Sequence, residues 1–183
     1  MNHMRVVAVV GMTGSGKSEV TKIFQDKGFS KVRFGDVTDA GVRRLGLELN
    51  EANERLVRER LREEHGMAAY ARLNRPRIDA ALKQSDVVVD GLYSWEEYTF
   101  LKEHYGKDFV VVAVWASPAT RYARLGQRRI RPLTPEESAA RDRAEIENLN
   151  KGGPIAMADF TVINESSRAD MKKQVERIIE KLK

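Results

Sequence analysis

The sequence contains no cysteine among its 183 residues. Disulfide bonds, thiolate metal ligands and cysteine nucleophiles are therefore excluded. Long apolar runs are also absent. The longest extends from Phe109 to Ala116, far too short to cross a bilayer, and the N-terminus lacks the apolar core of a signal peptide. We therefore expect a soluble, cytoplasmic protein with no membrane partner.

Nothing in the sequence divides the chain into parts. It has no linker of the usual composition, no low-complexity tract and no internal repeat with a period of roughly twenty to fifty residues. Its length suffices for one well-buried domain, so we predict a single domain over residues 1–183. The net charge of +5 suits a polyanionic ligand, either a nucleotide or a nucleic acid.

One stretch carries a nucleotide-binding pattern. Residues 11–18, Gly-Met-Thr-Gly-Ser-Gly-Lys-Ser, fit G-x-x-x-x-G-K-[ST], the loop that surrounds nucleoside triphosphate phosphates. A β-branched run at 5–10 precedes the loop, and a helical pattern at 17–27 follows it. The alternative, a glycine turn that happens to end in Lys-Ser, does not explain this order of strand, loop and helix.

The residue types in this loop match the chemistry of ATP and Mg²⁺. Glycines permit positive φ, so that successive backbone N–H groups can bind one phosphate. Lys17 is expected to reach the β- and γ-phosphates, and the Ser18 hydroxyl to ligate Mg²⁺. The predicted nucleotide-binding residues of this segment are Gly11, Thr13, Gly14, Ser15, Gly16, Lys17, Ser18 and Glu19.

Asp36 is the first candidate on the acceptor side. It follows a predicted strand at 30–34, and ligands in open α/β sheets bind beyond the carboxyl ends of the strands. A carboxylate there can orient the acceptor hydroxyl toward the γ-phosphate. The alternative role, which can coexist with the first, is the N-cap of the next helix.

Residues 38–83 are predicted to be mostly helical, with breaks near 49–50, 65–66 and 74–76. Most arginines of this block are expected on solvated faces, paired as Glu51 with Arg55 and Glu54 with Arg58. One or two could instead bind an acceptor phosphate. The arginines are Arg43, Arg44, Arg55, Arg58, Arg60, Arg62, Arg72, Arg75 and Arg77.

Asp90 ends a second apolar strand, predicted at 86–90, and Gly91 follows it. An acid at this place is expected to hold Mg²⁺ beside Ser18, directly or through water. The alternative is an ordinary Asp-Gly turn. The helix predicted at 95–104 has aromatic residues that we assign to the core rather than to base stacking.

Two arginine-rich helices follow a continuous apolar strand at 109–115. The first is predicted from Pro118 to Arg129, and the second from a Thr134 cap to about Lys151. Such a hairpin is typical of a lid that closes on phosphates. The alternative is a solvated hairpin whose charges, at 141–147, form surface ion pairs.

A loop at 151–154, a last strand at 159–163 and a terminal amphipathic helix at 168–183 complete the pattern. Five parallel strands with helices between them predict an α/β protein with a doubly wound sheet.

Together, the loop, Asp36, Val-Val-Val-Asp-Gly at 87–91, the arginine-rich hinge and Ala-Asp-Phe-Thr-Val-Ile-Asn at 158–164 resemble the nucleotide-kinase group of P-loop phosphotransferases. The C-terminal half is most similar to dephospho-coenzyme A kinase, whose Arg-Leu-x-x-Arg matches residues 124–128. Its Arg four residues before Gln matches Arg141, with Glu145 in place of Gln. The whole chain also resembles adenylate kinase-related proteins of archaea.

The resemblance implies a three-layer α/β/α P-loop fold with strand order 2-3-1-4-5. It further implies a helical acceptor-binding region at about 36–83 and a lid at about 121–151. By the same resemblance, Asp36 is the acceptor-side acid and Arg128 and Arg141 bind phosphate. Arg124 and Asn164 join the nucleotide-binding candidates.

The leading hypothesis is an ATP- and Mg²⁺-dependent kinase acting on a nucleotide-like small molecule, with Lys17, Asp36, Arg128 and Arg141 as catalytic residues and Ser18 and Asp90 at the metal. Adenylate kinases proper have Pro-Arg where Ser94 and Trp95 stand, which argues against a standard nucleoside monophosphate as acceptor.

Two other classes remain open. One is an ATPase or GTPase switch or assembly factor, although residues 150–153 lack the acid of the guanine motif Asn-Lys-x-Asp. The other is RNA binding or RNA-end phosphorylation. Because the arginines are interleaved with acids, a nucleic-acid partner ranks last.

Overall fold

The computed structural model describes residues 4–182. A five-stranded parallel sheet has the order β2-β3-β1-β4-β5, which confirms the predicted α/β class and strand order. The strands are β1 Val6–Val10, β2 Ser30–Arg33, β3 Val87–Asp90, β4 Phe109–Trp115 and β5 Phe160–Ile163.

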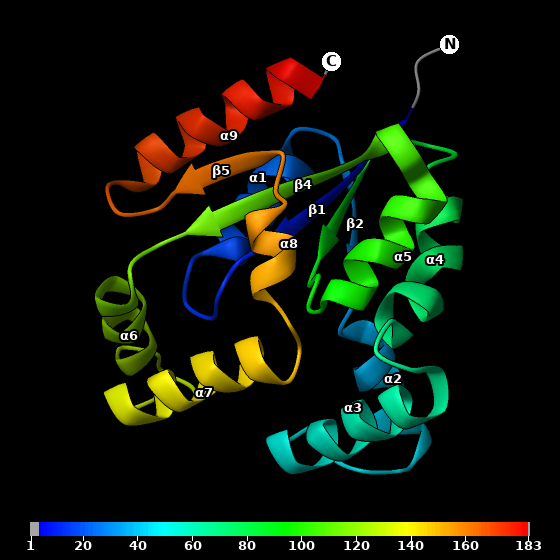
Figure 1. Cartoon of the computed structure of the whole chain (residues 1–183), viewed down its shortest axis with the longest axis vertical. Coiled ribbons are helices and arrows are strands. Elements are labelled where there is room, and N and C mark those ends of the chain that lie inside the picture. The colour runs from blue at the N-terminus through cyan, green and yellow to red at the C-terminus, as the bar shows by residue number, and fades with distance from the viewer. Residues whose placement is uncertain (1–3, 183) are drawn as a thin grey trace.

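The helices connect these strands and cover both faces of the sheet. They are α1 Lys17–Asp26, α2 Asp36–Arg44, α3 Glu51–His65, α4 Ala69–Ala81, α5 Trp95–Tyr105, η1 Gly106–Asp108, α6 Pro118–Gly126, α7 Pro135–Glu147, α8 Gly152–Ala156 and α9 Arg168–Leu182. Figure 1 shows α9 along one face of the sheet, α4 and α5 along the other, and α6 and α7 beyond the carboxyl end of β4.

Strand β1 lies at the centre, paired with β3 on one side and β4 on the other. All five of its residues are fully buried, because alternate side chains enter the two different core layers. Val7 and Val9 pack with Val20 and Phe24 of α1, whereas Ala8 packs in the layer formed with α2 to α5. The three-layer arrangement is therefore confirmed, and β1 holds the start of the 11–18 loop rigidly.

The predicted break at 74–76 is wrong, since α4 continues through Pro76. Proline removes one helical hydrogen bond, but tertiary contacts keep the helix intact. Asn74 is fully buried and donates its side-chain amide to the carbonyls of Tyr70 (3.0 Å) and Phe34 (3.3 Å). Ile78, one turn later, is also fully buried.

Three other boundaries differ from the sequence prediction, the first being that α7 ends at Glu147 rather than at about Lys151. Helix α6 ends at Gly126 rather than at Arg129, and residues 152–156, predicted as a loop, form the short helix α8. The cap at Thr134 is confirmed as a capping box, in which Thr134 and Glu137 each accept a hydrogen bond from the other's backbone N–H.

Among residues 4–182, no helix combines the length and the apolar composition that a bilayer crossing demands.

Candidate active site

The 11–18 loop joins β1 to α1 and adopts a conformation that only glycine tolerates at three places. Gly11, Gly14 and Gly16 have φ of 154°, 85° and 101°. Within residues 4–182, the N–H groups of Gly14, Gly16, Lys17 and Ser18 have no hydrogen-bond acceptor. Unpaired N–H groups at a helix N-terminus are the usual donors to a phosphate.

Lys17, at the start of α1, folds back over the loop. Its Nζ donates to the carbonyls of Gly11 (2.8 Å) and Met12 (3.0 Å). Burial and the neighbouring charge of Lys151 lower the pKa of Lys17 to about 7, although the charges of Glu145 and Asp90 act in the opposite direction. The hydrogen-bond acceptors of this buried ammonium within residues 4–182 are backbone carbonyls, so it is available to phosphate oxygens.

Two residues from other elements support the loop: Asn164 bonds to it directly, and Arg124 bonds to Asn164. The Asn164 side chain, after β5, donates to the Ser15 carbonyl (2.8 Å), and Arg124 of α6 donates to the Asn164 carbonyl (2.9 Å). A Cβ on Gly16 would lie 2.2 Å from the Asn164 amide nitrogen. Arg124 Nη1 and the Ser15 hydroxyl are buried without a partner in the described part of the chain.

Ser18 is exposed in the first turn of α1, and Asp90 lies at the end of β3. The Asp90 carboxylate accepts an ion pair from Lys31 at 2.8 Å. Both are oxygen donors of the kind that Mg²⁺ prefers. Glu19 is directed elsewhere: it pairs with Arg168 at the start of α9, at 2.5 Å.

Asp36 is the first residue of α2, with Gly35 at the N-cap. The alternative of an Asp36 cap is therefore wrong, because its side chain forms no cap and is bound elsewhere. It accepts from Arg77 of α4 at 2.6 Å and from Arg33 at 3.0 Å. Burial would raise its pKa, but the bonds to Arg77 and Arg33 lower it, so the carboxylate is ionised at neutral pH.

Arg128 and Arg141 lie near each other at the hairpin between α6 and α7. Burial and the charge of Arg141 lower the pKa of Arg128. The Arg128 guanidinium has no hydrogen-bond or ion-pair partner within residues 4–182, and Arg141 has only a 3.7 Å contact with Glu145. The charge of Arg141 also lowers the pKa of Lys17. Arg141 therefore adds to the positive potential at the loop.

The hairpin also contacts α3. Arg131, in the loop between α6 and α7, pairs with Glu51 at 3.3 Å and with Glu54 at 3.8 Å. It has a φ of 53°. Arg58 of α3 forms ion pairs with the same two glutamates, at 2.6 Å from Glu51 and 3.6 Å from Glu54. The predicted pair of Glu54 with Arg58 is confirmed. That of Glu51 with Arg55 is wrong, because Arg55 bonds to Glu59 one turn further along α3.

Four charged residues in or next to the hairpin are buried or half-buried, and two of them, Asp142 and Glu145, belong to the predicted surface ion pairs at 141–147. Arg121 and Asp142 form a bidentate ion pair with N–O distances of 2.7 and 2.6 Å. Glu145 bonds to Lys151, whose side chain is only 1% exposed. The solvated alternative is therefore wrong for Asp142 and Glu145, whereas Arg141, Arg143 and Glu147 of the same set are exposed. A single sequence holds no signal for this burial, because it depends on how separate elements pack together.

Glu97 of α5 is a further buried carboxyl that the sequence did not reveal. Its Oε2 accepts from the Tyr93 N–H at 2.8 Å, while Ser94 caps the helix. Oε1 has no partner within the described residues. Burial raises the pKa of Glu97 to about 8, against the opposing effects of the Tyr93 N–H and of Arg62. At neutral pH this carboxyl is therefore mostly protonated.

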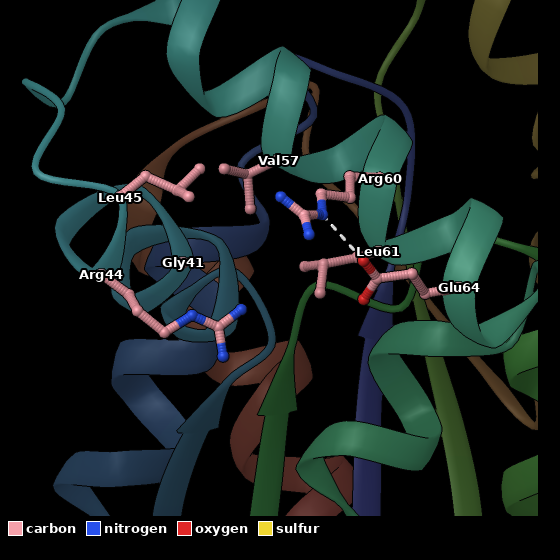
Figure 2. A pocket seen from close by; sticks show the side chains of 7 residues that line it. All are labelled: Gly41, Arg44, Leu45, Val57, Arg60, Leu61 and Glu64. Atoms are coloured by element: carbon pink, nitrogen blue, oxygen red, sulfur yellow. Dashed lines mark hydrogen bonds and ion pairs between the residues drawn. The ribbon is translucent and has the colours of Figure 1, made fainter.

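A small cavity of about 10 Å³ lies between α2 and α3, away from the loop. Figure 2 shows Arg44, Val57 and Leu61 around it, and Arg60 bonded to Glu64 along α3. A space of this size admits one water at most. We assign it no ligand.

The chain is similar to known proteins over nearly its whole length. A family model described as an AAA domain matches residues 7–148. The structure resembles TT1252 from Thermus thermophilus, with a TM-score of 0.70 at 21% identity over 99% of both chains. Shikimate kinase from Bacteroides thetaiotaomicron matches with a TM-score of 0.62 and 15% sequence identity. Dephospho-CoA kinase from Campylobacter jejuni matches with a TM-score of 0.55 and 16% sequence identity. Each match covers 98% of both chains. Identities this low show a shared fold, that of P-loop kinases.

Sequence relatives are closer. The UPF0200 protein TK1334 of Thermococcus kodakarensis is 40% identical over 185 residues, which cover 97% of this chain and 100% of that protein. A UPF0200 protein of Methanoculleus marisnigri is 34% identical over 178 residues, 96% of each chain. On this evidence the chain belongs to the UPF0200 family, and its fold is that of the P-loop kinases.

Proposed function

We propose that the chain is an ATP- and Mg²⁺-dependent phosphotransferase that acts on a nucleotide-like small molecule. One observation carries the proposal: four N–H groups of the glycine loop have no acceptor in the described protein, and the Lys17 ammonium lies over the same loop. Such a loop binds the phosphates of a nucleoside triphosphate. The kinase fold of the structural neighbours supports transfer rather than mere binding.

Ser18 and Asp90 would supply oxygen ligands to a magnesium ion that also needs the phosphates of the nucleotide. No group of three or more His, Cys, Asp or Glu side chains within residues 4–182 could hold a metal alone. Mg²⁺ commonly takes one or two protein oxygens together with phosphate oxygens. When bound, it would neutralise charge on the β- and γ-phosphates. Lys17, Arg128 and Arg141 would add to that neutralisation as charge develops in transfer.

On the acceptor side, Asp36 would accept a hydrogen bond from the hydroxyl that attacks the γ-phosphate. Its low pKa keeps it ionised, and its bonds to Arg33 and Arg77 fix its position. This makes Asp36 an orienting group rather than a strong base, since a carboxylate with a lowered pKa takes a proton poorly.

Arg62 is our candidate for an anionic group of the acceptor. Arg55, Arg58 and Arg60 of α3 each bond to a glutamate. Arg62 instead lies 5.4 Å from the Tyr70 ring centre, with a buried Nε that has no acceptor and no acidic partner in residues 4–182. An unpaired guanidinium of this kind suits a phosphate or carboxylate. A phosphate-bearing acceptor such as dephospho-coenzyme A fits this requirement.

The test is transfer of labelled phosphate. The protein, [γ-³²P]ATP and Mg²⁺ are incubated with nucleosides, nucleotides or dephospho-coenzyme A, and the products are separated. We expect a labelled product other than free phosphate. Lys17→Ala should lose ATP binding, whereas Lys22→Ala, an exposed lysine of the same helix paired with Asp26, should retain it. Release of free phosphate alone would favour a hydrolase, and equal ATP binding by Lys17→Ala would overturn the proposal.

A further inference from the structure

Thr13, in the middle of the 11–18 loop, is bonded to two different helices. Its carbonyl accepts from Arg121 Nη1 of α6 at 3.1 Å. Its hydroxyl donates to the Glu145 carboxylate of α7. Thr13 is 8% exposed, so both bonds are largely shielded from water. The loop that would receive the nucleotide phosphates is therefore attached at one residue to the hairpin that would cover them.

The two partners of Thr13 are themselves fixed. Arg121 is bound by the bidentate pair with Asp142 and also donates to the Ala116 carbonyl at 3.1 Å. Glu145 accepts from Lys151 Nζ at 2.9 Å. Asp142 and Glu145 are three residues apart, so they lie on the same face of α7. That face is the one turned to the loop.

Lys151 belongs to the body of the protein rather than to the hairpin. It is the N-cap of α8 and lies 5.6 Å from the ring centre of Tyr93, which follows β3. Asn150 before it has a φ of 50°. Gly153 after it packs so closely on Trp95 of α5 that a Cβ would lie 2.6 Å from the ring. The ammonium is therefore presented to Glu145 from a fixed position.

These bonds couple α7 to the loop. Because the charged members of the network are buried, leaving one of them without its partner is unfavourable. A movement of α7 away from the loop would break the Thr13 bond or displace Thr13 with it.

Resting on the proposed function, we propose that Glu145 and Lys151 are positioning residues that fix the 11–18 loop through the Thr13 hydroxyl and thereby set its affinity for the triphosphate. Neither touches the nucleotide in this proposal. The network also makes the loop respond to the position of the α6–α7 hairpin, so ATP binding and closure of the hairpin support each other.

The experiment compares ATP affinity with stability in Thr13→Val, Glu145→Ala and the double variant. ATP–Mg²⁺ binding is measured by calorimetry, and stability by thermal unfolding without nucleotide. We expect Thr13→Val to bind ATP about tenfold more weakly, the size of one lost hydrogen bond to a charged group. The double variant should bind no more weakly than Glu145→Ala, because both changes remove the same bond. Thr99→Val, which loses a hydroxyl bond within α5, should bind ATP like the parent.

A second readout separates positioning from general loosening of the fold. In the transfer assay, Lys151→Met should raise the KM for ATP while kcat at saturating ATP changes little. Lys151→Arg, which preserves the charge toward Glu145, should recover part of the loss. The inference is overturned if Thr13→Val binds ATP as tightly as the parent, or if the two single effects add. If the parent itself binds no ATP, the proposed function fails first, and this inference fails with it.

Discussion

The backbone of Gly16 lies directly against the side-chain amide of Asn164. A Cβ at Gly16 would come within 2.2 Å of that nitrogen, and the glycine has a φ of 101°. Gly16→Ala should therefore displace Asn164, distort the loop and abolish ATP binding. Gly28→Ala is the matched control, because Gly28 has a φ of 97° but no atom within 4 Å of the new Cβ.

Both alanine variants incur the backbone penalty of a left-handed residue, about 1–2 kcal/mol. Only Gly16→Ala adds the contact with Asn164. Calorimetric titration with ATP–Mg²⁺, together with urea unfolding, separates the two effects. Retained ATP affinity in Gly16→Ala would show that Asn164 does not support the loop.

Asp36→Asn tests the acceptor-side role. The substitution keeps the shape but removes the charge that Arg33 and Arg77 now bond. Phosphoryl transfer should fall by about a hundredfold, the size of effect expected when a reacting group is misplaced, with ATP affinity nearly unchanged. Asp39→Asn is the control, since Asp39 bonds to the same Arg33 at 2.7 Å but not to Arg77. Loss of ATP binding in Asp36→Asn would place Asp36 on the nucleotide side instead.

Arg62→Gln tests the acceptor's anionic group. Once an acceptor is identified, its KM should rise about tenfold to a hundredfold, as for one lost hydrogen bond between charged groups. The KM for ATP should not change. Arg60→Gln, on the same helix but bonded to Glu64 at 2.7 Å, should leave both values unaltered. Equal effects of the two variants would remove Arg62 from the site.

Glu97 predicts a pH dependence of stability. Its pKa rises from 4.5 in the unfolded chain to about 8 in the fold, so between these values the folded state binds more protons. The free energy of unfolding therefore falls as pH rises through this window, by at most about 1.4 kcal/mol per pH unit. Glu97→Gln lacks this loss, so its stability relative to the parent should increase from pH 5 to pH 9.

Urea unfolding of both proteins across that range measures the difference, in which the titration of other groups largely cancels. A difference that stays constant with pH would mean that Glu97 is ionised in the fold. The charge of the nearby Arg62 would then be compensated, which would also weaken its assignment to the acceptor.

Pro76 gives a prediction about folding alone. It is exposed within α4 and supplies no N–H to the helix. Pro76→Ala should raise the free energy of unfolding by about 1–3 kcal/mol, somewhat less than the full helix penalty of proline because the unfolded chain also gains freedom. Chemical denaturation checks this value. Destabilisation would show that α4 needs the proline geometry.

The sequence was sufficient for the fold because its strands are unambiguous. The apolar β-branched runs at 6–10, 87–90 and 109–115 leave no amphipathic alternative, and the glycine loop follows the first of them directly. The proline at position 76 led to the wrong prediction of a helix break. Asn74 donates a hydrogen bond to the carbonyl of Phe34, which is distant in sequence, and such a tertiary contact stabilises the helix in a way that local sequence rules do not include.

The candidate site was only partly predictable. Its loop residues follow from spacing, but the burial of Arg121, Asp142, Glu145 and Lys151 depends on how α6, α7 and α8 meet. In sequence these residues stand among many charges of both signs, and only their partners distinguish them. The difference between Arg62, which has no glutamate partner, and Arg60, which has one, was not predictable for the same reason. It depends on the directions of the side chains and on the contact of Arg62 with Tyr70.

The contact of Arg131 with Glu51 and Glu54 has a kinetic consequence. It joins the hairpin to α3, the two regions that the proposed function expects to separate when substrate enters, yet Arg131 and Glu51 are exposed and Glu54 is half-buried. Ion pairs of this kind contribute about 0–1 kcal/mol, close to thermal energy, and dissolved salt screens them. If the hairpin and α3 separate to admit substrate, as the proposed function expects, these ion pairs would resist the separation only weakly, and less still as ionic strength increases.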